Sequence, residues 1–194
     1  GGVITTNDKK ILNQLNNLVK HGIYRNKSTV NSKKSKGKWF YDLENIGLNY
    51  RLTDIQAALG LSQLKKLNNF ISKRKKLNIL YRSLFQKIPE IEIPTENTLH
   101  RTNYHIFVIL VKNQKIRYEL YNYLYSKKYA VMVHYIPLYK LKFYNNYFKS
   151  KKEFVISDNY YNRCISIPFY PSLTKKECLT FFKTVKSFFD DKNR

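Results

Sequence analysis

The stretch from Tyr104 to Tyr135 limits the fold more than any other part of this sequence. It opens with Tyr104–Val111 (YHIFVILV), a run of β-branched and aromatic residues that is typical of a buried strand. Apolar residues then recur at helical spacing between residues 116 and 124. Tyr129–Tyr135 (YAVMVHY) predicts a second strand, which Pro137 ends. A strand, a helix and a second strand in this order indicate a small α/β unit.

Two capping boxes predict where two further helices begin. In Thr53–Gln56 (TDIQ), the Thr53 side chain can accept a hydrogen bond from the Gln56 N–H while the Gln56 side chain reaches back. Thr174–Glu177 (TKKE) has the same spacing. From Thr53 an apolar stripe continues to about Phe85, so one long helix is expected there. A terminal helix is expected after Thr174.

Shorter elements complete the pattern. Asn7 or Asp8 can cap a helix whose apolar residues recur over 11–19, and Lys20–His21 are expected in its last turn. Two more elements are expected, a short helix at 157–164 and a short strand at 165–168.

The chain has 194 residues, enough for one domain or a domain and a half. Residues 1–70 hold too few elements to close a core alone, so we interpret them as the edge of a larger domain. Residues 71–194 are expected to form a small C-terminal α/β domain. The first residues, Gly1–Asp8 (GGVITTND), carry no initiator Met and no signal-peptide pattern, which favours the interior of a longer protein.

The net charge is +23, from 36 Lys and Arg against 13 Asp and Glu. Such a charge favours contact with nucleic acid or another anionic partner. The lysines are nevertheless spread along the chain, except for a cluster within residues 26–38, and spread charge usually marks a solvated surface. A basic nucleic-acid-binding module therefore stays a secondary alternative. The role of the lysine-rich loop 26–38 is left open.

Two cysteines, Cys164 and Cys178, are too few for a disulfide framework. We interpret them as reduced thiols of a cytosolic protein. The apolar runs fall short of the roughly 20 residues that a membrane span needs, so no membrane partner is expected.

The sequence has no glycine-rich phosphate loop, no Cys/His metal spacing and no nucleophile elbow. Three short stretches remain as candidate sites. Asn49-Tyr50-Arg51 combines an amide, a phenol and a guanidinium that could bind an anion, although an ordinary capped loop explains it too. Residues 133–139 end a strand with His and Tyr, where sites of α/β folds often lie, or are simply an aromatic strand end. Residues 166–171 contain two prolines that fix a stiff turn.

The order of these motifs resembles that of the DegT-type sugar-nucleotide aminotransferases. The resemblance runs through nearly the whole chain and is carried by GGVITTND, HGIYR, GLNYRLTDIQAALGLSQLKKL, VHYIPLY and SIPFYPSLT. The third of these motifs is the most specific. Within the family, NYHIFVIL, VHYIPLY and the aromatic run 139–148 favour the transaminases of pseudaminic acid synthesis.

The resemblance implies the C-terminal part of a pyridoxal 5′-phosphate (PLP) enzyme with the aspartate-aminotransferase fold, fold type I. It implies a cytoplasmic homodimer that shares its active site between subunits. The expected reaction moves an amino group from glutamate to a UDP-linked 4-keto-6-deoxy-N-acetylhexosamine. A relative that acts on another 4-keto or 3-keto nucleotide sugar, of the perosamine or 4-amino-arabinose type, remains an alternative.

The resemblance also assigns roles to single residues. Asn49 matches the asparagine that reaches the cofactor phosphate of the other subunit. The expected substrate contacts are Met132, Val133, His134, Tyr135, Arg51 and Tyr170. The Schiff-base lysine of the family is expected a few residues before Gly1, so no catalytic residue and no metal ligand is assigned within this chain, which would be inactive alone.

Overall fold

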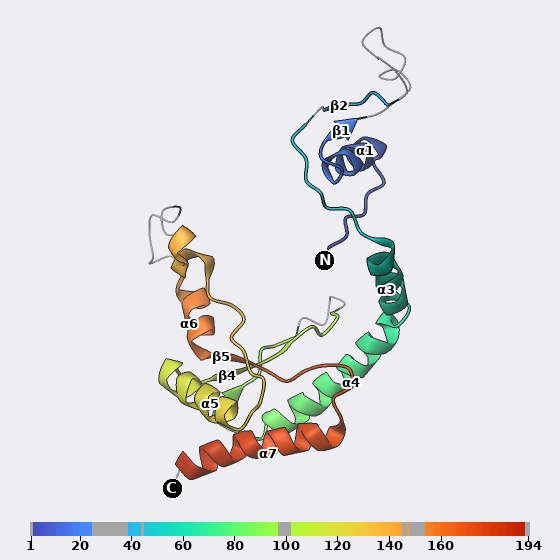
Figure 1. Cartoon of the computed structure of the whole chain (residues 1–194). Helices are drawn as coiled ribbons and strands as arrows, with labels where there is room; N and C mark the ends of the chain where they lie inside the picture. Colours follow the sequence, from blue (N-terminus) through green and yellow to red (C-terminus); the bar gives the residue numbers. More distant parts are fainter. Residues whose placement is uncertain are drawn as a thin grey trace. The chain divides into compact units, whose positions relative to one another are not determined.

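The computed structural model describes residues 2–24, 39–43, 45–96, 102–144, 147 and 154–192. The lysine-rich loop expected at 26–38 lies outside the described residues. The chain divides into two compact units, Gly1–Leu64 (the N-terminal unit) and Lys65–Arg194 (the C-terminal unit) (Figure 1). In the part of the chain that is described, no helix is both long and apolar enough to cross a membrane.

The N-terminal unit contains helix α1 (Lys9–Leu18), the antiparallel strands β1 (Ile23–Tyr24) and β2 (Asp42–Leu43), and helix α3 (Asp54–Leu64). Asp8 caps α1, because its carboxylate accepts hydrogen bonds from two N–H groups of the first turn. The expectation that Lys20 and His21 lie in the last turn of α1 is wrong. The helix ends at Leu18 because the backbone beyond it pairs with residues 48–50 instead.

The first capping box is confirmed. The Thr53 N–H donates to Gln56 Oε1 over 3.0 Å, and the Gln56 N–H donates to Thr53 Oγ1 over 3.3 Å. The single long helix expected after it is in fact two helices, because α3 ends at Leu64 and α4 (Leu67–Phe85) starts after Lys65–Lys66. The apolar pattern missed this break because lysine is a good helix former and leaves no breaking signal in the sequence.

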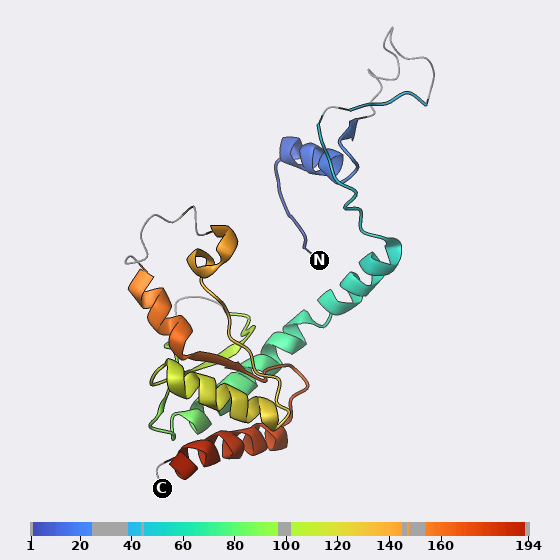
Figure 2. The same ribbon diagram turned by 60° about the vertical axis from the view of Figure 1, so that its left-hand side comes forward.

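The C-terminal unit is built on an antiparallel sheet in the order β3-β4-β5. Its strands are β3 (Ile91–Glu92), β4 (Phe107–Val111) and β5 (Cys164–Ile167), and its further helices are α5 (Gln114–Ser126), α6 (Val155–Arg163) and α7 (Lys175–Lys192). Two 3₁₀ turns, η1 (Leu138–Lys140) and η2 (Lys142–Tyr144), precede α6. The second capping box also forms, with the Thr174 N–H donating to Glu177 Oε2 over 2.7 Å. Helix α7 runs beneath α5 and α4 in Figure 2, and it contacts both.

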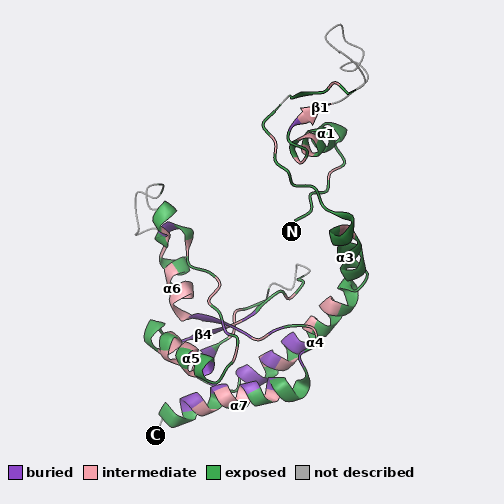
Figure 3. Cartoon of the chain, viewed as in Figure 1, coloured by how far each residue is buried: buried purple, intermediate pink, exposed green. Residues whose placement is uncertain are grey.

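One hydrophobic core holds this unit together. Most of its buried residues come from α4, α5, α7 and the alternate positions of β4 and β5 that face these helices. Tyr81 is fully buried between Phe85, Phe107 and Phe181, and its hydroxyl donates to the Pro168 carbonyl over 3.1 Å. Figure 3 shows the buried residues along α7 and the second half of α4, whereas α3 is drawn almost entirely as exposed.

The second strand expected at 129–135 is wrong in extent. Only Met132 pairs with the sheet, in an isolated antiparallel bridge to Ser166 of β5. The valines of this stretch are explained by burial and not by strand pairing, since Val131 is only 2% exposed. Residues 131–134 therefore run along the edge of β5 opposite β4. They form an irregular segment that one backbone bridge, at Met132, joins to the sheet.

Candidate functional site

Residues 47–51 of the N-terminal unit form a turn that is fixed to the end of α1. The N–H groups of Leu48 and Tyr50 donate to carbonyl groups of Leu18 and Val19, over 2.7 Å and 3.2 Å. Asn49, between them, bridges to Lys20. These backbone bonds fix the direction in which the Asn49 side chain leaves the turn.

A close pair of glycines makes this approach possible. Gly22 has a φ of +72°, and a Cβ there would lie 1.7 Å from the carbonyl oxygen of Asn45. A Cβ on Gly47 would lie 2.1 Å from the Gly22 nitrogen. Because no side chain fits between these backbones, glycine is required at both positions.

Arg51 orients the Asn49 amide. Its Nε donates to Asn49 Oδ1 over 3.1 Å, so the amide oxygen is engaged and the amide N–H donors face away from it. Both side chains are exposed. Arg51 also lines a hollow of about 520 Å³ with Lys20, His21 and three asparagines of α1. The pair offers the Asn49 amide N–H groups and the remaining guanidinium N–H groups of Arg51, which are donors suited to an oxyanion such as a phosphate.

In the C-terminal unit, the expected substrate stretch Met132–Tyr135 lies against β5. The Met132 N–H donates to the Ser166 carbonyl over 3.1 Å, and the Ser166 N–H donates to the Met132 carbonyl over 2.7 Å. Because side chains alternate between faces along an extended backbone, Met132 and His134 project on the face that carries the Ser166 side chain. His134 Nδ1 lies 2.8 Å from Ser166 Oγ, within hydrogen-bond distance.

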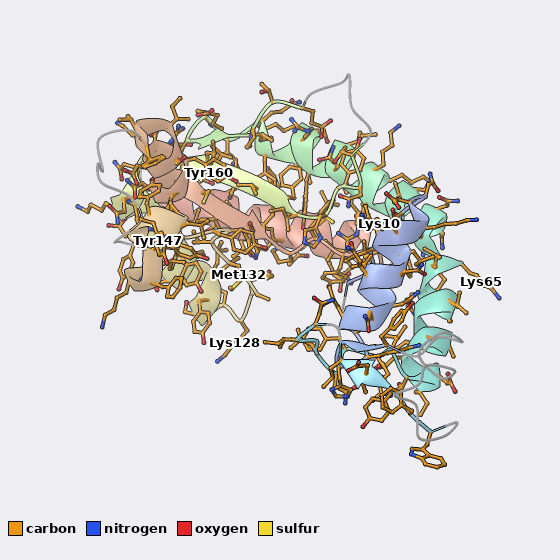
Figure 4. The ribbon with its side chains drawn as sticks, turned by 90° about the horizontal axis from the view of Figure 1, so that it is seen from above. Lys10, Lys65, Lys128, Met132, Tyr147 and Tyr160 are labelled. Carbon is orange, nitrogen blue, oxygen red and sulfur yellow. The ribbon has the colours of Figure 1, made fainter. Side chains whose placement is uncertain are left out.

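Tyr135 marks the edge of an apolar hollow. Its ring packs edge-on against the His134 imidazole at 4.6 Å between centroids, and its side chain is 69% exposed. The peptide bond between the two residues is cis. The hollow has a volume of about 630 Å³ and is lined by Tyr135, Ile136, Pro137, Leu138, Ile156, Ser157 and Tyr160. Figure 4 shows Met132 and Tyr160 among the side chains of this unit.

A polar network fixes the turn after Tyr135 to α6. The Tyr139 hydroxyl donates to Asp158 Oδ1 over 2.9 Å, and Lys140 Nζ lies 2.5 Å from the same oxygen. The hydrogen bond from Lys140, followed by the one from Tyr139, holds the pKa of Asp158 below its usual value. The segment that carries His134 and Tyr135 is therefore anchored at both ends, by Met132 and by Tyr139.

Tyr170 lies four residues beyond Ser166, in the turn that leads to α7, with 43% of its side chain exposed. Its carbonyl accepts a hydrogen bond from the Leu173 N–H over 3.0 Å. The described hydrogen bonds do not join it to Met132–Tyr135.

The structure thus brings the expected site residues together in two groups, one in each unit. Asn49 and Arg51 form the first, and Met132, Val133, His134 and Tyr135 form the second. Sequence reasoning included Ser166 in the candidate stretch 166–171 but gave it no role, and the structure joins it to the second group. A signal was present, since Ser166 is the polar residue in β5 (CISI), whose other side chains are buried and apolar.

The described residues favour neither a metal site nor a cysteine nucleophile. They contain no cluster of three or more His, Cys, Asp and Glu that could hold a metal ion. Cys164 and Cys178 are free and buried, and burial raises the pKa of both thiols. A buried thiol with a raised pKa is a poor nucleophile at neutral pH.

Comparison with known proteins identifies relatives along most of the chain. Residues 1–186 match the DegT/DnrJ/EryC1/StrS aminotransferase family. The spore coat polysaccharide biosynthesis protein SpsC of Bacillus subtilis is 33% identical over 179 residues, which cover 90% of this chain and 46% of SpsC. The UDP-4-amino-4,6-dideoxy-N-acetyl-beta-L-altrosamine transaminase of Campylobacter jejuni is 28% identical over 179 residues, 91% of this chain and 45% of the transaminase.

Solved structures agree on the fold. The putative sugar aminotransferase Spr1654 from Streptococcus pneumoniae, in its PLP form, superposes with a TM-score of 0.81 at 23% identity, over 96% of this chain and 45% of Spr1654. The chain spans about half the length of the curated relatives that it matches.

Proposed function

The chain belongs to the DegT/DnrJ/EryC1/StrS aminotransferase family, and we propose that it is the C-terminal part of a transaminase acting on a sugar nucleotide. The fold class expected from the sequence, an α/β part of a PLP-dependent transferase, is confirmed by the likeness to Spr1654. The family match over residues 1–186 is the observation that carries the proposal. Because relatives are about twice as long, the activity is proposed for the longer polypeptide.

The cofactor expected from the sequence is PLP, and the donor set of the N-terminal unit fits its phosphate. Asn49 offers amide N–H groups, since Arg51 engages the amide oxygen, and the Arg51 guanidinium adds positive charge. A neutral amide on a backbone-fixed turn suits an anion that other groups already hold. In the proposed homodimer, Asn49 serves the cofactor of the partner subunit.

For the substrate, we propose a UDP-linked 4-keto-6-deoxy-N-acetylhexosamine, with glutamate as the amino donor. The altrosamine transaminase of C. jejuni supports this branch at 28% identity. Another 4-keto or 3-keto nucleotide sugar, of the perosamine or 4-amino-arabinose type, is the second candidate. The proposed sugar contacts are Met132, Val133, His134 and Tyr135, with Arg51 and Tyr170 as further candidates.

The residues of this chain act by binding and orienting. When bound, PLP supplies the electron sink through which an amino group leaves glutamate and reaches the keto sugar. His134 and the Tyr135 hydroxyl offer hydrogen bonds to sugar hydroxyl groups, while the apolar hollow beside Tyr135 offers contact area without hydrogen-bond donors. The anchors at Met132 and Tyr139 keep these groups in place before the sugar arrives.

The test is an assay of the longer polypeptide that includes the sequence upstream of Gly1. The purified enzyme is incubated with PLP, glutamate and the UDP-linked 4-keto sugar, and mass spectrometry follows formation of the amino sugar and of 2-oxoglutarate. Asn49→Ala is expected to weaken PLP binding, and His134→Ala is expected to raise the KM for the sugar. Tyr118→Ala, on the exposed side of α5, is the control.

Two outcomes would change the proposal. Amino transfer only to another 4-keto or 3-keto nucleotide sugar, of the perosamine or 4-amino-arabinose type, would move the enzyme to the second candidate. Failure to aminate any keto nucleotide sugar while PLP is bound would reject the function. A steeply salt-dependent shift of DNA would instead favour the basic binding module.

A further inference from the structure

The side chain of Ser166 makes a contact that the proposed site does not yet use. Its hydroxyl lies 2.8 Å from Nδ1 of His134, a residue 32 positions away in the sequence. Ser166 is only 5% exposed, so this hydroxyl is shielded from solvent. A buried hydroxyl without a partner is costly, and His134 supplies the partner.

The position of Ser166 is fixed by the backbone on both of its sides. On one side, β5 pairs with β4 in a register that sets Ser166 opposite Val108. On the other, the Ser166 N–H and carbonyl both bond to Met132. A hydroxyl on such a backbone can move only by rotation about its own Cα–Cβ bond, so it is a rigid anchor for the imidazole.

The imidazole is restrained from a second direction as well. The Tyr135 ring packs edge-on against it, with an angle of 67° between the two ring planes. With Nδ1 held by Ser166, the remaining ring nitrogen that can meet a ligand is Nε2. The Ser166 hydroxyl can donate to Nδ1 or accept from it, so it fixes the orientation of the ring in either proton state of Nε2.

We propose that Ser166 is a positioning residue, whose hydrogen bond to Nδ1 fixes the His134 ring so that Nε2 faces the sugar nucleotide. This inference rests on the proposed function, because it takes His134 as a sugar contact. It assigns to Ser166 no contact with substrate or cofactor. It predicts that removing the hydroxyl loosens a binding group without touching the chemistry of amino transfer.

The first experiment measures the ring itself. The sequence contains four histidines, so the chain labelled with ¹⁵N-histidine gives a spectrum that can be assigned with a His134→Gln variant. At a pH well above the ordinary histidine range, the ¹⁵N shift of His134 Nδ1 reports whether Nδ1 takes part in a hydrogen bond, with the serine hydroxyl as donor or as acceptor. We expect the Nδ1 shift of a hydrogen-bonded nitrogen in the wild type and in Ser166→Thr, and a changed Nδ1 shift in Ser166→Ala. Ser126→Ala, at the exposed end of α5, is the control, since the Ser126 hydroxyl donates to the Tyr123 carbonyl and not to a histidine.

The second experiment measures binding in the longer enzyme. Ser166→Ala is expected to raise the KM for the sugar nucleotide by up to about tenfold, the usual value of one hydrogen bond. The kcat and the KM for glutamate should stay near the wild-type values, and Ser166→Thr should restore the KM for the sugar. A merely structural serine would lower stability without this selective change in KM.

The two experiments separate the inference from the proposed function. An unchanged Nδ1 shift of His134 in Ser166→Ala would overturn the positioning role, whatever the enzyme's activity. A changed Nδ1 shift with an unchanged KM for the sugar would overturn it too. An inactive wild-type enzyme would overturn the proposed function, whereas the Nδ1 shift decides the hydrogen bond on its own.

Discussion

Helices α3 and α7 begin with the same kind of capping box, yet only α7 enters a core. In α7, Cys178, Phe181, Val185, Phe188 and Phe189 are buried against the sheet and its neighbours. In α3 no residue is buried, and Ile55, Leu59, Leu61 and Leu64 are all more than 60% exposed. A well-formed helix start is therefore a local property, whereas burial needs partners that lie far away in the sequence.

The same contrast separates the two units as wholes. All buried hydrophobic residues among the described parts of the chain lie between Leu77 and Phe189. The described part of the N-terminal unit is held by backbone hydrogen bonds, caps and the glycine pair, and it leaves a large apolar surface exposed.

Separating the units should produce the largest effect. Residues 65–194 expressed alone are expected to unfold cooperatively, because they contain the whole core. Residues 1–64 alone are expected to show no cooperative transition. The few apolar side chains that they bury would offset little of the conformational entropy that folding costs. Thermal unfolding followed by circular dichroism measures both. A sharp transition in residues 1–64 would contradict the comparison.

Substitution of one large apolar side chain in each unit is the next test. Phe85→Ala removes a fully buried ring and should lower the free energy of unfolding by about 3–5 kcal/mol. Ile55→Ala removes a side chain that is 84% exposed, and the change should stay within about 0.5 kcal/mol. Urea unfolding of the full chain measures both, and equal effects would show that α3 is buried in solution.

Glycine substitutions test what holds the Asn49 turn. Gly22→Ala should cost about 1–3 kcal/mol locally, because of its positive φ and because the new Cβ meets the Asn45 carbonyl. Gly60→Ala is the control, since nothing lies within 4 Å of its Cβ position, and in a helix it should gain about 0.5–1 kcal/mol. Hydrogen exchange at the Tyr50 amide, which bonds to Val19, measures the turn. Unchanged exchange in Gly22→Ala would mean that the glycine pair is dispensable.

The paired capping boxes give the smallest expected effect. Loss of either threonine cap should cost its helix about 1 kcal/mol. Thr174→Ala should therefore lower the unfolding midpoint of the C-terminal unit, while Thr53→Ala should increase exchange only at the start of α3. A lowered midpoint in Thr53→Ala would show that α3 shares the stability of the core.

The two boxes should also differ in their response to acid. The hydrogen bonds from Thr174, first of its side chain and then of its backbone, lower the pKa of Glu177. Their stabilisation is present above the pKa of an unfolded glutamate and is lost as the pH falls through the lower folded value. Gln56 does not titrate, so the α3 box should keep its strength in acid. Hydrogen exchange at the two helix starts, measured from neutral to acidic pH, tests this difference.

Local hydrogen bonds explain which parts of the fold could be predicted from the sequence. The Asp8 cap and both capping boxes involve residues two or three positions apart, and all three form as expected. The expected strand at 129–135 failed because a ladder needs a partner along its whole length, and β5 offers Met132 a single bridge. The two-residue strands β1, β2 and β3 are too short to show a period.

The residues of the candidate site also divide into those that short motifs indicate and those that depend on contacts between distant segments. The resemblance to the aminotransferase family, carried by the motifs and their order, proposed Asn49 and the stretch Met132–Tyr135 as site residues. The link between Ser166 and His134 could not be predicted in this way, because it depends on how β5 and the irregular segment are set side by side. The pairing of Arg51 with Asn49 spans only two residues, yet the sequence did not indicate which amide atom it would engage.

The bridge between Met132 and Ser166 uses backbone atoms only. Every amino acid except proline provides the same N–H and carbonyl groups, so mutation of either side chain leaves this clamp intact. A substitution of Met132 therefore changes the side chain at the proposed sugar contact while the backbone clamp on β5 stays in place.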